Sequence, residues 1–292
     1  MSKLIECVPN FSEGRDETVI EEIAAAVKTA KVLDLHSDPD HNRSVLTMIG
    51  SPEGVKQAAL DLTERAMQLL NVGEHSGEHP FIGVVDVIPF IPIGETTMQE
   101  AVILAHQTGH ELWNKLKLPV YFYGEAAKIA ERRDLPYVRK GGYHALVNEI
   151  NTPRRQPDVG TGLHPNAGAV AVGARNFLIA FNINLDTGDE DIAHSIAKAI
   201  REKDGGLPGV RALGIYLDSR GIGQVSVNIT NHQETSLKLV YDEVVSWARE
   251  YKVNILESEI VGLIPASAAF KDMKEHLKLK SLDKRIILDN HL

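Results

Sequence analysis

The chain has 292 residues, of which 43% are hydrophobic, so it is long enough to bury one large core or two smaller ones. Its formal net charge of −9 and the lack of a basic cluster along the sequence argue against nucleic-acid binding. A single cysteine, Cys7, excludes an internal disulfide and a cysteine-based zinc site.

The first 95 residues predict the element order β-α-β-β-α-β. Apolar and alternating runs indicate strands at residues 4–10, 31–37, 43–50 and 84–93. Proline is expected to interrupt the second half of the last of these strands. Apolar residues at helical spacing indicate helices at 15–30 and 52–70. This order is typical of the split βαβ, or ferredoxin-like, unit.

The segment 96–175 follows this unit and belongs to no repeat. It predicts a helix at 98–117, a short strand at 119–124 and a mixed helical region, followed by a loop at 156–168. That loop is rich in glycine and proline and poor in apolar residues. Such a loop is either mobile filler or a ligand-binding element.

The same element order returns in the last part of the chain. Strands are indicated at residues 176–185, 210–218, 222–230 and 253–265, with helices at 189–203 and 234–251. We therefore predict an α+β fold, an α/β sandwich of two ferredoxin-like βαββαβ subdomains that span residues 1–175 and 176–292. The helix-free faces of the two sheets are expected to pack on each other or to flank a cleft.

Residues 75–83 read HSGEHPFIG and place two histidines four residues apart. The pattern H-x-x-E-H is typical of inverted zinc proteases, in which a helix aligns both imidazoles on a metal. Gly77 and Pro80 disfavour a helix here, so we expect a turn and no metal. His75 and His79 are then either solvated loop residues or, because proline stiffens this loop, acid–base groups near neutral pH.

Two further polar stretches carry candidate residues. HSDPDHNR, at 36–43, contains good turn formers, and we expect it to contribute one or two site residues as well. As a mixed nitrogen and oxygen metal site, its spacing is generic. VPNFSEGR, at 8–15, either caps the following helix or lines a site through Asn10.

The sequence shows neither a membrane-spanning segment nor a signal peptide. No apolar run reaches the ~18 residues of a membrane span. The N-terminal residues MSKLIECV turn polar too early for a signal peptide. We therefore expect a cytoplasmic protein, in which Cys7 is a buried strand residue rather than a nucleophile.

Several long motifs in register resemble one known family. They are ECVPNFSEGR, HNR, GEHPFIGVVDVIPFIPI, VYFYGEAA, GARNFLIAFNINL and QVSVNIT, and they run in order over residues 1–265. Together they resemble the glutamate formimidoyltransferase family of histidine degradation. The tail stretch SLDKRIILDN resembles it more weakly.

The resemblance implies a folate-dependent one-carbon transferase. Members of the family transfer the formimidoyl group of N-formimidoyl-L-glutamate to N5 of tetrahydrofolate, with or without a polyglutamate tail, and release L-glutamate. They are typically homodimers of two-subdomain chains with a cleft or tunnel between the subdomains, and no metal is implied. Vertebrate members are fused to a cyclodeaminase. This shorter chain is expected to lack that activity or to depend on a separate cyclodeaminase.

The resemblance also assigns site residues. The catalytic histidine is the one in Gly-Glu-His-Pro, which is His79 here. The folate-binding segment corresponds to Gly160, Thr161, Gly162, Leu163, His164, Pro165, Asn166, Ala167 and Gly168. This loop is slightly shorter than in the vertebrate members and has Ala167 where they carry an aromatic residue, so its pterin contacts are expected to differ.

The expected chemistry is a proton transfer between two nitrogens. His79 takes a proton from N5 and returns it to the leaving glutamate nitrogen, with Asp38 orienting the ring. Arg43 and Arg175 either bind the substrate carboxylates or form surface salt bridges. The alternatives are a formyltransferase that uses N-formylglutamate, a folate-binding module without turnover, and a zinc hydrolase.

Overall fold

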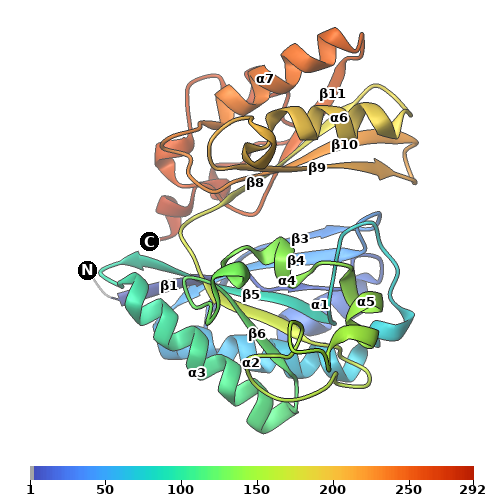
Figure 1. Cartoon of the computed structure of the whole chain (residues 1–292). Helices are drawn as coiled ribbons and strands as arrows, with labels where there is room; N and C mark the ends of the chain where they lie inside the picture. The colour runs from blue at the N-terminus through green and yellow to red at the C-terminus, as the bar shows by residue number, and fades with distance from the viewer. Residues whose placement is uncertain (1–2) are drawn as a thin grey trace. The chain divides into compact units, whose positions relative to one another are not determined.

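The structure is a computed structural model that describes residues 3–292. The described residues form two sheets with helices on them, and the chain divides after Asn176 into two compact units (Figure 1). We call residues 1–176 unit 1 and residues 177–292 unit 2. Within the described residues, no helix is both long and apolar enough to cross a membrane. The predicted α+β class is confirmed.

Unit 1 begins with the predicted β-α-β-β-α-β order. Its elements are β1 (Lys3–Cys7), α1 (Glu17–Ala25), β3 (Lys31–Asp38), β4 (Arg43–Gly50), α2 (Pro52–Leu69) and β5 (Val85–Gly94). The strands are antiparallel neighbours in the order β5-β1-β4-β3, which is the ferredoxin-like arrangement. A short strand, β2 (Asn10–Phe11), continues the line of β1 and pairs with β4 and β5.

The segment 96–175 extends this sheet, which the sequence analysis did not predict. It contributes α3 (Met98–Leu116), β6 (Val120–Gly124) and β7 (Val170–Ala174). β7 pairs in parallel with β5, and β6 pairs in parallel with β7. Further short helices follow β6, namely η2 (Ala130–Arg133), α4 (Leu135–Val138) and α5 (Gly142–Glu149). The sheet of unit 1 therefore has seven strands.

The prolines in β5 do not interrupt the strand, contrary to expectation. Pro89 lies opposite the break between β1 and β2, where its carbonyl accepts a hydrogen bond from the Val8 backbone N–H (3.3 Å). On the other side of β5, the pairing with β7 ends where Phe90 pairs with Ala174. Pro92 lies beyond this last pair. Both prolines lie where a missing N–H leaves the sheet ladder intact, so the strand continues.

The helices α2 and α3 cover one face of the unit 1 sheet (Figure 1). α2 begins after the N-cap Ser51 with Pro52 in its first turn, as apolar spacing and capping predict. Its buried residues recur three or four positions apart: Val55, Ala58, Ala59, Leu62 and Ala66. Ile5, Cys7, Leu46 and Met48 meet them from the strands, so Cys7 is a buried strand residue as predicted.

Unit 2 repeats the ferredoxin-like order without an insertion. Its elements are β8 (Ile179–Leu185), α6 (Glu190–Ile200), β9 (Val210–Leu217), β10 (Ile222–Ile229), α7 (Leu237–Glu250) and β11 (Ile255–Val261). The antiparallel strands lie in the order β11-β8-β10-β9. The helices α6 and α7 cover one face of the sheet, and only short helices such as α8 (Met273–His276) follow β11 (Figure 1). Apolar residues that alternate along the strands fill the core beneath the helices.

Candidate functional site

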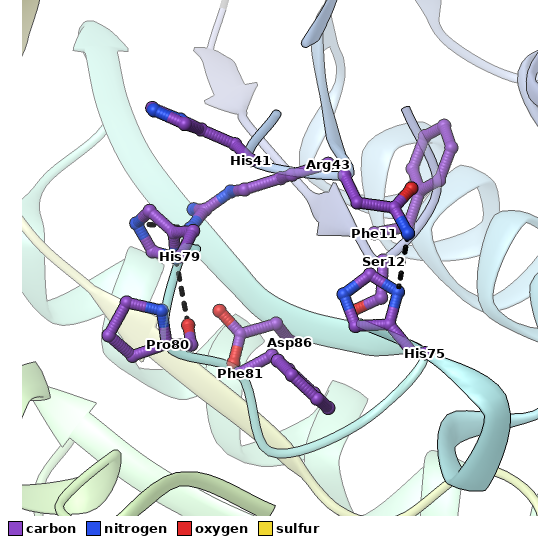
Figure 2. A pocket seen from close by; sticks show the side chains of 10 residues that line it. Phe11, Ser12, His41, Arg43, His75, His79, Pro80, Phe81 and Asp86 are labelled. Atoms are coloured by element: carbon purple, nitrogen blue, oxygen red, sulfur yellow. Dashed lines mark hydrogen bonds between the residues drawn. The ribbon is translucent and has the colours of Figure 1, made fainter. Parts of the chain in front are cut away.

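A pocket in unit 1 gathers side chains from three segments of the chain (Figure 2). The end of β2, the turn before β4 and the loop before β5 meet there, and β5 adds one side chain. The lining residues are Phe11, Ser12, His41, Asn42, Arg43, His75, His79, Pro80, Phe81 and Asp86. The loop and the turn were both predicted to carry site residues.

The loop that carries both histidines is not an α-helix, as Gly77 and Pro80 predicted. A short helix, η1 (Val72–Glu74), ends before His75, and residues 75–81 have no helical structure. A Cβ on Gly77 would lie 2.3 Å from the backbone oxygen of His41, so only glycine lets the loop pack this closely on the turn. Without a helix, the sequence pattern no longer implies a zinc site.

The two histidines have different surroundings. The ring of His75 packs edge-on against Phe81 with centroids 4.4 Å apart, and its Nδ1 lies 3.4 Å from Nδ2 of Asn42. His79 instead faces Arg43 (Figure 2). Among residues 3–292, no group of three or more histidine, cysteine or acidic side chains could hold a metal. The two histidines therefore have separate partners in this geometry.

His79 is held by hydrogen bonds on both ring nitrogens. Nδ1 lies 2.8 Å from the Pro80 carbonyl oxygen and also contacts Nη1 of Arg43. Nε2 lies 2.6 Å from the same Nη1. The other terminal nitrogen of Arg43 donates to Oδ1 of Asn10. Asn10, Arg43 and His79 thus form one connected group.

The surroundings keep His79 neutral. Burial lowers the pKa of its imidazole well below the usual range, and the cations of Arg43 and Arg139 lower it further. A neutral imidazole can accept a proton at its unprotonated ring nitrogen at neutral pH. The geometry therefore suits His79 to take up a proton in one step of a reaction and to return it in a later step.

Asp86 completes the pocket, although the sequence analysis missed it. Phe11 pairs with Val85 while the adjacent Asn10 pairs with Val87, so Asp86 is the extra residue of a β-bulge. Its Oδ1 accepts from the backbone N–H of Ile82 (3.1 Å), and its Oδ2 forms an ion pair with Arg139. The only sequence signal was a lone acidic residue in the apolar run VVDVIPF.

Asp38 and Arg175 lie outside the pocket lining. Oδ1 of Asp38 accepts from the backbone N–H groups of Asp40 (2.9 Å) and His41 (2.8 Å), so this side chain shapes the turn rather than contacting His79. Arg175 follows β7, and its Nη1 donates to the Asn176 carbonyl (3.0 Å). Of the four supporting residues expected from sequence, Arg43 contacts His79, and Asn10 contacts Arg43.

The glycine-rich loop runs beside the chain that follows His79. The Val84 N–H donates to the Ala167 carbonyl (3.0 Å), and the Ala169 N–H donates to the Ile82 carbonyl (3.0 Å). Ala167 is fully buried, and Nδ1 of His164 accepts from its N–H (3.0 Å). The end of the loop is therefore part of the core. Within the loop, the side chains of Thr161, Pro165 and Asn166 are exposed.

Comparisons with known proteins agree over the whole chain. Residues 4–175 match the N-terminal subdomain of the formiminotransferase domain, and residues 180–290 match the formiminotransferase domain. The chain is 40% identical to a glutamate formimidoyltransferase of Streptococcus pyogenes, with 100% of this chain and 99% of that protein covered. It is 41% identical to one of Thermoplasma acidophilum, with 99% and 97% covered.

A longer relative matches equally well. The formimidoyltransferase-cyclodeaminase of Sus scrofa is 42% identical over 99% of this chain, which spans 56% of that protein. The two matched family segments fall on the two units of the structure, and the loop with His79 lies within the first. The chain therefore belongs to the formiminotransferase domain family.

Proposed function

We propose that this chain is a glutamate formimidoyltransferase, which moves the formimidoyl group of N-formimidoyl-L-glutamate to N5 of tetrahydrofolate. Two relatives with that name match at 40% and 41% identity over nearly their whole length. The observation that carries the mechanism is the position of His79, a neutral imidazole held between the Pro80 carbonyl and the guanidinium of Arg43.

The reaction is an addition followed by an elimination. N5 of tetrahydrofolate attacks the formimidoyl carbon and forms a tetrahedral intermediate. Nε2 of His79 takes the proton that N5 loses and delivers it to the glutamate nitrogen as the old carbon–nitrogen bond breaks. General acid–base catalysis of this kind typically contributes ~10²–10⁴ in rate, and alignment of the two bound substrates contributes much of the remainder.

Arg43 has to release Nε2 before the proton can be taken. Its two terminal nitrogens contact His79 and Asn10, so they are not available together for a bidentate hydrogen bond to a carboxylate. A substrate carboxylate at this guanidinium competes for the same donors and frees the imidazole. Substrate binding would thus switch on the base. Arg175 is the second candidate for carboxylate binding.

Further properties of the family enter the proposal. We propose tetrahydrofolate, with or without a polyglutamate tail, as acceptor, and residues Gly160 to Gly168 as part of its binding site. The loop supports this because its backbone pairs with the segment just after His79. A homodimer, a cytoplasmic location and a separate cyclodeaminase that consumes the product complete the proposal.

An assay with purified protein tests this function. Wild-type protein is mixed with tetrahydrofolate and either N-formimidoyl-L-glutamate or N-formyl-L-glutamate, and released glutamate is measured. We expect turnover with the formimidoyl donor at a higher kcat/KM than with the formyl donor. A preference for the formyl donor would replace the proposed substrate, and folate binding without any transfer would leave only a binding module.

Variants of the two histidines test the mechanism. His79→Ala should lower kcat by ~10²–10⁴ while the affinity for the stable product analogue 5-formyltetrahydrofolate stays within a few fold. His75→Ala is the matched control from the same loop and should be much milder. Near wild-type turnover by His79→Ala contradicts the assignment, and equal loss in both variants revives a joint role of the pair.

A further inference from the structure

Among the described residues that line the pocket of unit 1, Asp86 is the only acidic one, and the mechanism proposed above does not use it. The residue lies on the bulge of β5 and is 2% exposed. Figure 2 shows its carboxylate pointing toward the side of the pocket that holds His79 and away from the ring of His75. A buried carboxylate is costly unless it is paired, so its partners decide whether its role is purely structural.

The partners of Asp86 use only part of its hydrogen-bonding capacity. Oδ1 accepts from the backbone N–H of Ile82 (3.1 Å), and Oδ2 accepts from Nη2 of Arg139. An ionised carboxylate offers about four lone-pair sites, so about two remain for a further donor. The cation of Arg139 offsets the negative charge without covering the carboxylate, since Asp86 still lines the pocket. The pocket therefore presents an anionic acceptor to a ligand.

The size and the charges of the pocket suit the reacting end of a small zwitterion. The pocket encloses about 180 Å³ including its open mouth, less than the ~300–1,000 Å³ of sites that enclose a drug-sized ligand. The cation of Arg43 and the anion of Asp86 are both part of the lining, together with His79. A ligand that matches these two charges carries a carboxylate close to a cationic group with N–H donors.

The formimidoyl donor has this pattern of charges, whereas its formyl counterpart lacks the cation. The formimidoyl group is an amidine, a base strong enough to be protonated at neutral pH, and it is attached next to the α-carboxylate of the glutamate. In N-formyl-L-glutamate an oxygen replaces the terminal nitrogen, so the group is uncharged and offers an acceptor at that position. A carboxylate attracts the protonated nitrogen of the first group and repels the oxygen of the second.

Resting on the function proposed above, we infer that Asp86 selects the donor by binding the protonated terminal nitrogen of the formimidoyl group. When N5 of tetrahydrofolate attacks the carbon, the positive charge passes from the amidinium to N5, which then yields its proton to His79. The same proton reaches the glutamate nitrogen, the bond between this nitrogen and the carbon breaks, and an amidinium forms again on N5. With the formyl donor, the attack places negative charge on an oxygen beside Asp86, which raises the barrier.

The ratio of kcat/KM for the formimidoyl donor to kcat/KM for the formyl donor measures this selection, because the fraction of folded protein cancels. Asp86→Asn/Arg139→Met removes the carboxylate together with the cation that neutralises it, and the ratio should fall by about 10- to 100-fold. Glu78→Gln is the matched control, since this exposed carboxylate adjoins His79 but lies outside the lining. Its ratio should stay within about threefold of wild type. An unchanged ratio in the double variant, or an equal fall in the control, overturns the inference.

Two unreactive analogues test the same selection without turnover. N-carbamimidoyl-L-glutamate carries a guanidinium in place of the formimidoyl group, and N-carbamoyl-L-glutamate carries a neutral urea of nearly the same shape. Calorimetric titration of the wild-type protein should show at least about tenfold tighter binding of the guanidinium compound. The double variant should lose this preference, and Glu78→Gln should keep it. Equal affinities of the wild type for the two analogues, tighter binding of the urea, or binding of neither overturns the inference.

The titrations also separate this inference from the proposed function. If the double variant does not fold, the wild-type titration still decides whether the pocket prefers the cation. A wild-type protein that transfers neither group, but loses its preference for the guanidinium analogue when Asp86 is replaced, would refute the proposed transferase and leave the recognition by Asp86 standing. Transfer of the formimidoyl group with an unchanged donor ratio in the double variant would do the reverse.

Discussion

Replacing Glu6 with glutamine should change how stability depends on pH. Glu6 lies on β1 and is 2% exposed. Burial raises the pKa of its carboxyl to about 7, although the nearby cation of Arg175 acts in the opposite direction. Compared with the ordinary value of 4.5, a pKa of about 7 corresponds to about 3 kcal/mol. The folded state keeps the proton longer, so stability falls as pH rises from about 4.5 through about 7.

Urea unfolding of both proteins between pH 5 and pH 8.5 measures this effect. Glu6→Gln cannot ionise, so its stability relative to wild type should rise by about 2–3 kcal/mol across this range and stay constant above it. Glu21→Gln, at an exposed position of α1, is the matched control and should run parallel to wild type. If the curve of Glu6→Gln also runs parallel to wild type, the carboxyl of Glu6 does not titrate as the buried geometry requires.

Three other substitutions test the pocket. Arg43→Met removes the cation next to His79, which raises the pKa of the imidazole and moves the acidic limb of the kcat/KM profile to higher pH; an unmoved limb would rule out this coupling. Gly77→Ala drives a Cβ against the His41 carbonyl and should cost about 1–3 kcal/mol in urea unfolding, whereas Gly73→Ala, whose Cβ has room, should be nearly neutral. Asp86→Asn leaves the cation of Arg139 without its partner and should cost about 3–5 kcal/mol, and the added change Arg139→Met should restore much of that loss in a double-mutant cycle.

Local patterns predicted the elements that local forces determine. The helix expected at 52–70 forms at Pro52–Leu69, because capping and apolar spacing are readable over one stretch of chain. β7 was missed, since VAVGA is short, small and without alternation, and it becomes a strand only beside β5. The parallel extension of the sheet is therefore a property of tertiary pairing, which a single sequence does not display.

The site residues also divide into those that a local sequence pattern predicts and those that depend on tertiary contacts. His79 was assigned from a motif, and the structure adds its contacts with Arg43 and with the Pro80 carbonyl. Asp86 was missed because its position depends on a bulge and its partner, Arg139, comes from a distant segment. The expected partner of His79, Asp38, instead fixes the turn. Residue types were readable from the sequence, whereas their pairing required the fold.

Among the described residues, each repeat has a buried, unpaired polar atom on the third strand of its βαββαβ order. In each βαββαβ unit the helices cover one face of the sheet, which leaves the other face free of their packing requirements. Thr47 lies on β4, the third strand of the first repeat, between the core residues Leu46 and Met48, so it faces away from the helices. Its Oγ1 is buried without a partner, as is Oε1 of Gln224 on β10, the third strand of the second repeat. An unpaired buried polar atom destabilises a fold, so each of these two atoms lowers the stability of its own unit.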